Sequence, residues 1–176
     1  LRTKQIPSPK ILIKDHKAGK DGQFPLCLVI LATNFTACFS QVDYLGLKYI
    51  LDSHNVKYNR FSIAQALDLK TILMRLELNR DLHSIFSIDV VNMYPSIKFD
   101  LIAKAIRFFS KSLPLRARNT IMTCLELIKF GMSSTLVTFC DKYYQYHGGN
   151  KEGERGLAIG GYKSAFLADV VASYLM

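Results

Sequence analysis

Residues 87–97 read SIDVVNMYPSI, and this stretch is the most informative part of the chain. The apolar run from Ile85 to Ile88 predicts a β-strand that ends at Asp89. A strand end in a rigid sheet would hold this carboxylate in place and still leave it open to solvent. Such an acid is costly unless it is paired, hydrogen-bonded or bound to a cation, so Asp89 is a candidate metal ligand. An aromatic residue, Tyr94, follows five positions later.

Around this stretch the sequence predicts helices mixed with short strands, without the regular alternation of a doubly wound sheet. Apolar residues recur at helical spacing over five segments: 42–51, 62–76, 101–109, 114–128 and 166–175. Further β-type runs occur at 11–13, 26–31, 136–139 and 143–146. Turn-rich residues 18–22 and 140–142 would close two hairpins. The expected fold class is α+β, with helices packed on a small antiparallel sheet. Asp43 is expected to be an ordinary helix acid.

Composition narrows the function classes further. The chain has 176 residues, of which 49% are hydrophobic and 21% charged, so a packed core is expected and disorder is not. No stretch approaches the roughly 20 apolar residues of a membrane helix, which predicts a soluble protein without a membrane partner. The four cysteines form no CxxC pair, which favours reduced thiols in an intracellular protein.

The formal charge is +9, and it is unevenly placed. Residues 1–20 carry six basic side chains and one acidic side chain, so +5 of the total lies in this segment. A basic surface of this kind attracts polyanions such as nucleic acid. The alternative is a solvated surface that only keeps the protein soluble.

Three patterns follow one another along the chain: a two-part fingers-type pattern at 9–17 (PKILIKDHK) and 24–30 (FPLCLVI), the Asp-to-Tyr stretch at 87–97, and a Gly-rich pattern at 156–168 (GLAIGGYKSAFLA). In this order, the three elements resemble the reverse transcriptases of Penelope-like and related non-LTR retroelements (retrotransposons). Residues 9–17, PKILIKDHK, are similar to the basic fingers segment, and residues 24–30, FPLCLVI, to the strand after it. Residues 87–97 resemble the first carboxylate motif of the palm. Residues 156–168, GLAIGGYKSAFLA, are similar to the Gly-rich element G-x-A-M-G-S-x-x-S-P-x-L-A. The resemblance covers roughly residues 7–176.

The resemblance implies a right-hand polymerase fold, with a fingers-like part at about 1–80 and a palm-like part at 81–176. It implies an RNA-directed DNA polymerase, a nucleotidyltransferase that adds deoxynucleotides to a primer 3′-hydroxyl by two-metal phosphoryl transfer. An RNA template, a DNA primer and dNTPs would be the partners, and two Mg²⁺ ions the cofactors. The nucleus is then one candidate compartment.

Site residues follow from the same resemblance. Asp89 would bridge the two metal ions, and the carbonyl of Val90 could add a further oxygen ligand. Tyr94 corresponds to the aromatic residue that packs beneath the incoming sugar and rejects a 2′-hydroxyl. Lys14 and Lys17 lie in the segment that contacts the triphosphate.

Further candidate contacts with the nucleotide or the nucleic acid lie elsewhere in the sequence. Gly160 and Gly161 would let the backbone approach the nucleotide closely. Lys10, Tyr144 and Gln145 are candidate nucleic-acid contacts: Lys10 carries a positive charge, and the tyrosine cluster beside Gln145 could stack on bases.

The sequence also departs from the family pattern. Cys27 stands where an Arg is usual, Gly161 replaces a Ser, and Ala165 replaces a Pro. No Asp-Asp pair occurs, whereas the family's second carboxylate motif follows the helix at which this sequence stops. The chain is therefore expected to be a fragment that ends before this motif and is inactive alone. Two alternatives remain: a degenerate, non-catalytic nucleic-acid-binding domain, and a basic α+β scaffold unrelated to nucleic acid.

Overall fold

The computed structural model describes residues 9–13, 26–29, 37–58, 66–76, 84, 87, 89–90, 92–146, 155–161 and 163–176. Across these ranges the chain forms six helices: α1 (Ala37–Ser53), α2 (Ala66–Arg75), α3 (Met93–Ser96), α4 (Phe99–Ser110), α5 (Leu115–Ser133) and α6 (Ser164–Leu175). It also forms four short strands: β1 (Lys10–Ile13), β2 (Leu26–Val29), β3 (Leu136–Phe139) and β4 (Lys142–Gln145). The strands make two separate antiparallel pairs, β1–β2 and β3–β4. The mixed α+β class expected from the sequence is confirmed at this level.

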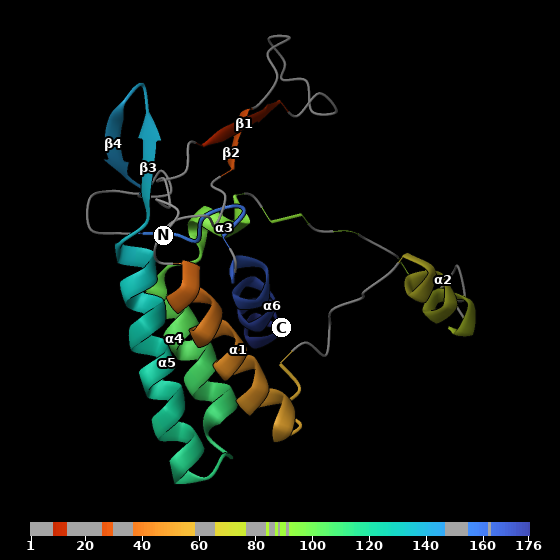
Figure 1. Cartoon of the computed structure of the whole chain (residues 1–176). Helices are drawn as coiled ribbons and strands as arrows, with labels where there is room; N and C mark the ends of the chain where they lie inside the picture. Colours follow the sequence, from red (N-terminus) through yellow and green to blue (C-terminus); the bar gives the residue numbers. More distant parts are fainter. Residues whose placement is uncertain are drawn as a thin grey trace.

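The core of the molecule is a bundle formed by α1, α4, α5 and α6 (Figure 1). Helix α5 packs against α1 and α4, and α4 also packs against α6. Each helix presents a stripe of apolar residues three or four positions apart, so the four stripes meet in one interior. The largest fully buried apolar side chains of this interior are Leu47, Leu51, Ile102, Ile106, Ile121, Leu125, Ile128, Leu167, Val170 and Val171.

Helix α1 lies against α5 near Gly46, and aromatic contacts join it to α6. A Cβ on Gly46 of α1 would lie 3.7 Å from Sγ of Cys124 in α5, which is ordinary van der Waals contact. The ring of Phe166 in α6 meets Tyr44 edge-on, with the ring centroids 5.2 Å apart, and Tyr58 in the same manner at 5.3 Å. Edge-to-face pairs of this kind stabilise a core by about 0.5–1.5 kcal/mol beyond their burial.

The predicted helices are present, but several differ in length. Helix α1 begins five residues before the predicted start at residue 42 and ends two residues later than predicted. Helix α5 begins after Pro114, as expected, and continues to Ser133, beyond the predicted end at 128. For α2, the capping residues predicted at 62–65 lie outside the described residues. Packing against neighbouring helices extends α1 and α5 beyond the segments whose spacing indicates a helix.

Both hairpins lie beyond the same end of the bundle, and α3 caps that end (Figure 1). In β1–β2 the pairing runs from Lys10 opposite Val29 to Ile13 opposite Leu26, which confirms the expected hairpin. Its predicted turn at 18–22, with residues 30–31, is outside the described part of the chain.

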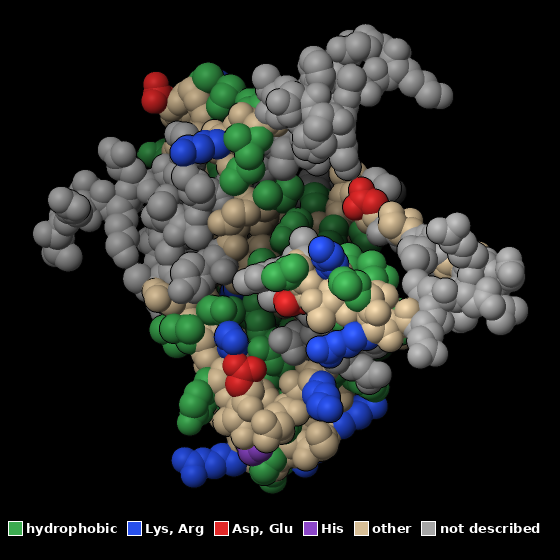
Figure 2. Space-filling model, turned by 90° about the vertical axis from the view of Figure 1, so that its right-hand side faces the viewer, with side chains coloured by type: hydrophobic (Ala, Val, Ile, Leu, Met, Phe, Trp, Pro, Cys, Tyr) green, Lys and Arg blue, Asp and Glu red, His purple; other side chains and the backbone are tan. Residues whose placement is uncertain are grey.

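Helix α2 is set apart from the bundle (Figure 1). Most of its apolar side chains are exposed, among them Leu67, Ile72 and Met74. Figure 2 views this side of the molecule and shows hydrophobic side chains next to Lys and Arg side chains on the surface. No helix in the described ranges is both long enough and apolar enough to cross a membrane.

Candidate nucleotide and nucleic-acid site

Asp89 and Val90 precede α3 in irregular backbone, and both residues are exposed. Most of the strand predicted at 85–88 lies outside the described residues, and Ser87, which is described, is not in a strand. The Asp89 carboxylate is therefore accessible to a cation or a ligand from solvent.

Tyr94 is held by the single turn of α3. Asn92 enters this turn with φ of +50°, a left-handed conformation that Asn tolerates better than most residues. The amide of Ser96 donates to the carbonyl of Asn92 at 3.0 Å, and the amide of Ile97 donates to that of Tyr94 at 3.2 Å. Tyr94 is half-buried and packs against the core. Its ring is thus fixed just after the segment that carries Asp89.

The start of the Gly-rich segment packs directly on this turn. The amide of Leu157 donates a hydrogen bond to the carbonyl of Tyr94 at 2.9 Å, and Gly156 forms an isolated antiparallel bridge with Lys98. A Cβ on Gly156 would lie 2.0 Å from the carbonyl oxygen of Pro95, so only glycine allows the two backbones to come this close. The structure therefore joins two motifs that are far apart in the sequence.

Gly160 and Gly161 lie in the turn that leads into α6. Gly160 has φ of +85° and is exposed. The amide of Gly161 donates to the carbonyl of Ala158 at 3.1 Å, and a Cβ on Gly161 would lie 2.5 Å from Oγ of Ser164. Both glycines thus have a local role in shaping this turn, and the close approach of a nucleotide to them stays a prediction.

Lys163, the residue before α6, turns inward and pairs with Asp43 of α1. The Asp43 side chain is fully buried and that of Lys163 is 8% exposed. Gly131 of α5 makes room for the pair, since a Cβ there would lie 3.1 Å from the Lys163 Nζ. Burial raises the pKa of Asp43, although the positive charge of Lys163 opposes the shift. Burial likewise lowers the pKa of Lys163 against the attraction of Asp43. Desolvation therefore dominates both groups.

The expectation that Asp43 is an ordinary helix acid is wrong, because its side chain lies on the buried face of α1. Asp43 precedes Leu47 and Leu51 at intervals of four residues, so these three positions share one face of the helix. The sequence therefore contained a signal for the burial of Asp43, namely an acidic residue on the apolar face of a helix. The partner, Lys163, follows 120 positions later and has no local signal that relates it to Asp43.

The β3–β4 hairpin has a tighter turn than the sequence suggested. Cys140 and Asp141 form a two-residue turn with φ of +48° and +58°, so β4 starts at Lys142. The prediction of a three-residue turn at 140–142 and a strand over 143–146 is wrong by one position, since the turn has two residues and the strand covers Lys142–Gln145. Turns with two positive φ values match the right-handed twist of paired strands, which favours the shorter loop.

Tyr144 and Gln145 occupy opposite faces of this hairpin, because successive side chains of a strand alternate. Tyr144 is paired with Val137, whose side chain is buried, and remains 47% exposed. Tyr143, on the face shared with Gln145, is 69% exposed. The structure thus offers Tyr143 as the most open aromatic ring of the hairpin for stacking on a base.

Gln145 contacts the end of α5 through its side chain. Its Nε2 donates to the carbonyl of Ser133 at 2.7 Å, and Nη1 of Arg155 donates to the same oxygen. Two donors at a helix C-terminus satisfy carbonyls that have no partner within the helix, and the Arg155 charge complements the helix dipole. Arg155 and Ser133 were not singled out in the sequence, because neither belongs to a recognisable spacing.

The basic fingers-like segment is described only in part. Lys10 is exposed at the start of β1, where its charge can reach a ligand. Lys14 and Lys17 lie outside the described residues. Cys27, at the position where the resemblance would lead one to expect an Arg, is paired with Leu12 in the β1–β2 hairpin.

The described residues do not by themselves fit a pair of Mg²⁺ ions. Among them, no group of three or more His, Cys, Asp or Glu side chains could hold a metal. Asp89 supplies one accessible carboxylate and Val90 one carbonyl, whereas two adjacent metal ions require several oxygen ligands. Any complete metal site would need ligands beyond this part of the chain.

Comparisons with models of protein families, with curated proteins and with solved structures find no match for this chain.

Proposed function

We propose that the chain is part of an RNA-directed DNA polymerase of the retroelement type, with a fingers-and-palm arrangement. In this proposal it binds an RNA template, a DNA primer and a deoxynucleoside triphosphate. The reaction joins the primer 3′-hydroxyl to the α-phosphate of the nucleotide and releases pyrophosphate. Asp89 is the proposed catalytic carboxylate.

The junction between Tyr94 and Leu157 carries this proposal. The segment with Asp89 and Tyr94 and the Gly-rich segment are two of the three elements of the family resemblance. Their backbones are in direct contact through the hydrogen bond of 2.9 Å and the tight approach at Gly156. A polymerase site needs these elements side by side, because one positions the metal and sugar and the other the nucleotide and template.

Each residue has a defined part in this proposal. The exposed Asp89 carboxylate would contribute to holding Mg²⁺, together with carboxylates beyond the described residues. The half-buried ring of Tyr94 would contact the sugar of the incoming nucleotide and leave no space for a 2′-hydroxyl. The positive charge of Lys10 and of the segment around it would attract the phosphates of nucleotide and template.

A test of sugar selection addresses both the reaction and the role of Tyr94. The protein, expressed from its complete reading frame, is given an RNA template, a DNA primer and either dNTPs or rNTPs with Mg²⁺. The wild type should extend the primer with dNTPs and discriminate against rNTPs. Tyr94→Ala should reduce this discrimination by about tenfold or more, since about 1.4 kcal/mol of lost steric selection has that effect. Absence of template-dependent extension in the wild type would refute the proposal.

A second candidate is a non-catalytic domain that binds nucleic acid. It is favoured by one observation, the lack of any cluster of potential metal ligands among the described residues. This function predicts salt-dependent binding of single-stranded oligonucleotides without extension of a primer. It also predicts weaker binding for Tyr143→Ala than for the wild type, because base stacking on an exposed ring contributes about 1–3 kcal/mol.

A further inference from the structure

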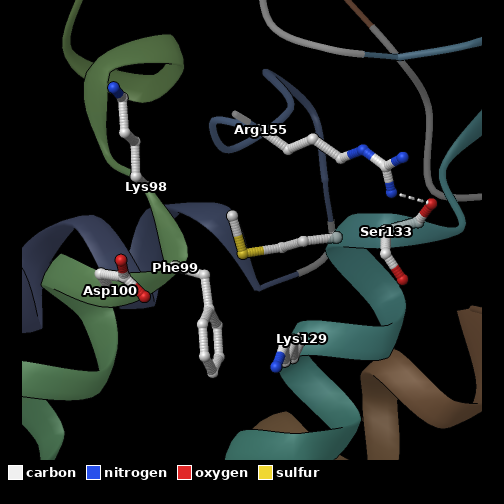
Figure 3. A pocket seen from close by; sticks show the side chains of 7 residues that line it. Lys98, Phe99, Asp100, Lys129, Ser133 and Arg155 are labelled. Atoms are coloured by element: carbon white, nitrogen blue, oxygen red, sulfur yellow. Dashed lines mark hydrogen bonds between the residues drawn. The ribbon is translucent and has the colours of Figure 1, made fainter. Parts of the chain in front are cut away.

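A pocket of about 280 Å³ lies beside the proposed site, between the start of α4 and the end of α5 (Figure 3). Arg155, which precedes Gly156 in the sequence, forms a third side of the pocket, next to the two helices. The apolar part of the lining is the ring of Phe99 and the thioether of Met132. The pocket is thus adjacent in the fold to the contact between Tyr94 and Leu157, but contains none of the residues assigned above to nucleotide binding.

Three basic side chains from three different segments line this pocket: Lys98, Lys129 and Arg155. Asp100 is the one acidic residue in the lining, so the formal charge of the lining is +2. Cations held around a concave, partly apolar surface concentrate positive potential, and a bound anion relieves their mutual repulsion. The net positive charge of the lining therefore favours an anion as the ligand of this pocket.

The contacts of two of these cations leave capacity for a ligand. Arg155 donates from Nη1 to the carbonyl of Ser133, and a guanidinium has five N–H donors. Its Nε is buried without a hydrogen-bond partner among the described residues, so the donors available to a ligand in the pocket are the remaining Nη N–H groups. The Lys129 Nζ lies 5.7 Å from the centroid of the Phe99 ring, a weak cation–π contact that a direct anion contact can outweigh.

The start of α4 adds to the attraction for an anion. Lys98 is the N-cap residue of this helix, and its side chain makes no capping hydrogen bond. The first amide groups of a helix lack partners within the helix and carry partial positive charge. Helix α4 therefore begins at the wall of a pocket that three basic side chains already line.

We propose that this pocket binds a phosphate group, carried by a nucleic-acid strand or by a free nucleotide. Its volume of about 280 Å³ lies just below the roughly 300–1,000 Å³ of ligand pockets, so one phosphate with its sugar fits better than a large cofactor. Oxygens of the phosphate accept from Lys129 and Arg155, and from Lys98 once its flexible side chain, which points toward α3 in Figure 3, turns back to the pocket; the sugar lies against Phe99 and Met132. This site does not depend on Asp89 or on any metal ion, so it stands or falls separately from the proposed polymerase function.

The test compares two double variants of equal charge. In Lys98→Gln/Lys129→Gln the pocket loses two cations, whereas Lys57→Gln/Lys104→Gln removes two exposed lysines that do not line the pocket. Binding of a labelled oligo-dT strand is measured by fluorescence anisotropy over a range of salt concentrations. Binding of dTMP and of inorganic phosphate is measured by calorimetry. EDTA is present throughout, so no metal-dependent site contributes, and thermal unfolding confirms that each variant is folded.

We expect the pocket variant to bind at least one of these probes more weakly than the control variant by about tenfold or more, equivalent to about 1.4 kcal/mol or more, because it loses two cationic donors to the phosphate. A loss for the oligonucleotide alone, with a salt slope smaller by about 1.4, identifies a strand phosphate as the ligand. A loss that includes dTMP or inorganic phosphate identifies a free nucleotide. Lys98→Arg/Lys129→Arg should restore binding. Equal affinity of the two Gln variants for all three probes would overturn the proposal.

Discussion

At the scale of single residues, Gly156 has the strictest steric requirement in the candidate site. Its missing side chain lets the Gly-rich segment reach the α3 turn, where a Cβ would lie 2.0 Å from the Pro95 carbonyl oxygen. That oxygen belongs to the backbone, so it cannot move away as a flexible side chain could. The contact between the two motifs therefore depends on this one glycine.

We predict that Gly156→Ala lowers the free energy of unfolding by about 1–3 kcal/mol, as overpacking does in well-packed sites. The measurement is urea denaturation followed by circular dichroism. The matched control is Gly46→Ala within α1, where the added Cβ would lie 3.7 Å from Cys124 Sγ and meet no close neighbour. Because Ala is the better helix former, the control should be neutral or stabilised by up to about 1 kcal/mol. Equal stabilities of the two variants would contradict the close approach at Gly156.

Asp52 provides a pH-dependent contribution to stability. Burial acts to raise its pKa, but hydrogen bonds from the Tyr58 hydroxyl at 2.8 Å and the Lys48 Nζ at 3.0 Å outweigh this effect and lower the pKa. A lowered pKa in the folded state stabilises the protein above the ordinary pKa of an Asp, and this contribution disappears as the pH falls through the folded value.

We predict that Asp52→Asn flattens the dependence of the unfolding free energy on pH below about pH 5. The loss at neutral pH should stay within about 0.2–1 kcal/mol, because the Asp52 side chain is 48% exposed and the pair is screened by solvent. The amide oxygen of Asn can still accept from Tyr58. An unchanged acid-side slope in urea titrations from pH 7 to pH 3 would show that Asp52 has no altered pKa in the folded protein.

Sequence patterns drew attention to residues that lie within one short motif. Asp89 and Tyr94 were singled out because both residues belong to one short motif, and their roles stay predictions. Asp43, Arg155 and Ser133 were missed, because each acquires its contact only when distant segments fold together. Charge pairs and helix-end contacts of this kind depend on packing and have no sequence period.

At the scale of elements, α1 is joined to the start of α6 by the buried pair of Asp43 and Lys163. Both side chains lose their hydration, and burial therefore raises the pKa of Asp43 and lowers the pKa of Lys163. Each shift favours the neutral form of its group. Such a pair contributes little net stability, but the removal of one partner leaves the other charge buried and uncompensated.

A double-mutant cycle tests this pair. We predict that Asp43→Leu and Lys163→Met, made singly, each lower the free energy of unfolding by about 3–5 kcal/mol. The two substitutions together should cost much less than the sum of the single losses, and can even stabilise the protein, because no charge is then left in the core. Additive losses in urea denaturation would mean that the two side chains do not interact.

Most elements were predictable from apolar spacing, but their exact limits were not. The stripes of α4, α5 and α6 and the β1–β2 pair follow directly from the residue pattern. The turn of β3–β4 was placed one residue too long, since Cys140 is an unusual residue for a positive φ and Lys142 gives no signal of a strand start. Backbone conformations that a residue type adopts rarely are hard to predict from composition.

At the scale of the whole molecule, the bundle supports the end at which the candidate sites lie. Helix α3, the contact with Gly156 and both hairpins lie at this end of the helices (Figure 1). The pocket proposed to bind phosphate lies between the start of α4 and the end of α5 (Figure 3). Rigid helices that present loops and short strands at one end are well suited to hold a site in fixed geometry.

The most direct measurement of the central claim is primer extension by the protein expressed from its complete reading frame, with an RNA template, dNTPs and Mg²⁺. We predict template-dependent extension by the wild type and a loss of about a thousandfold or more in Asp89→Ala, equivalent to roughly 4 kcal/mol of the barrier. Glu126→Ala, which removes an exposed acid on α5, should retain the wild-type rate. Extension that persists in Asp89→Ala, or no extension by the wild type, would contradict the assignment.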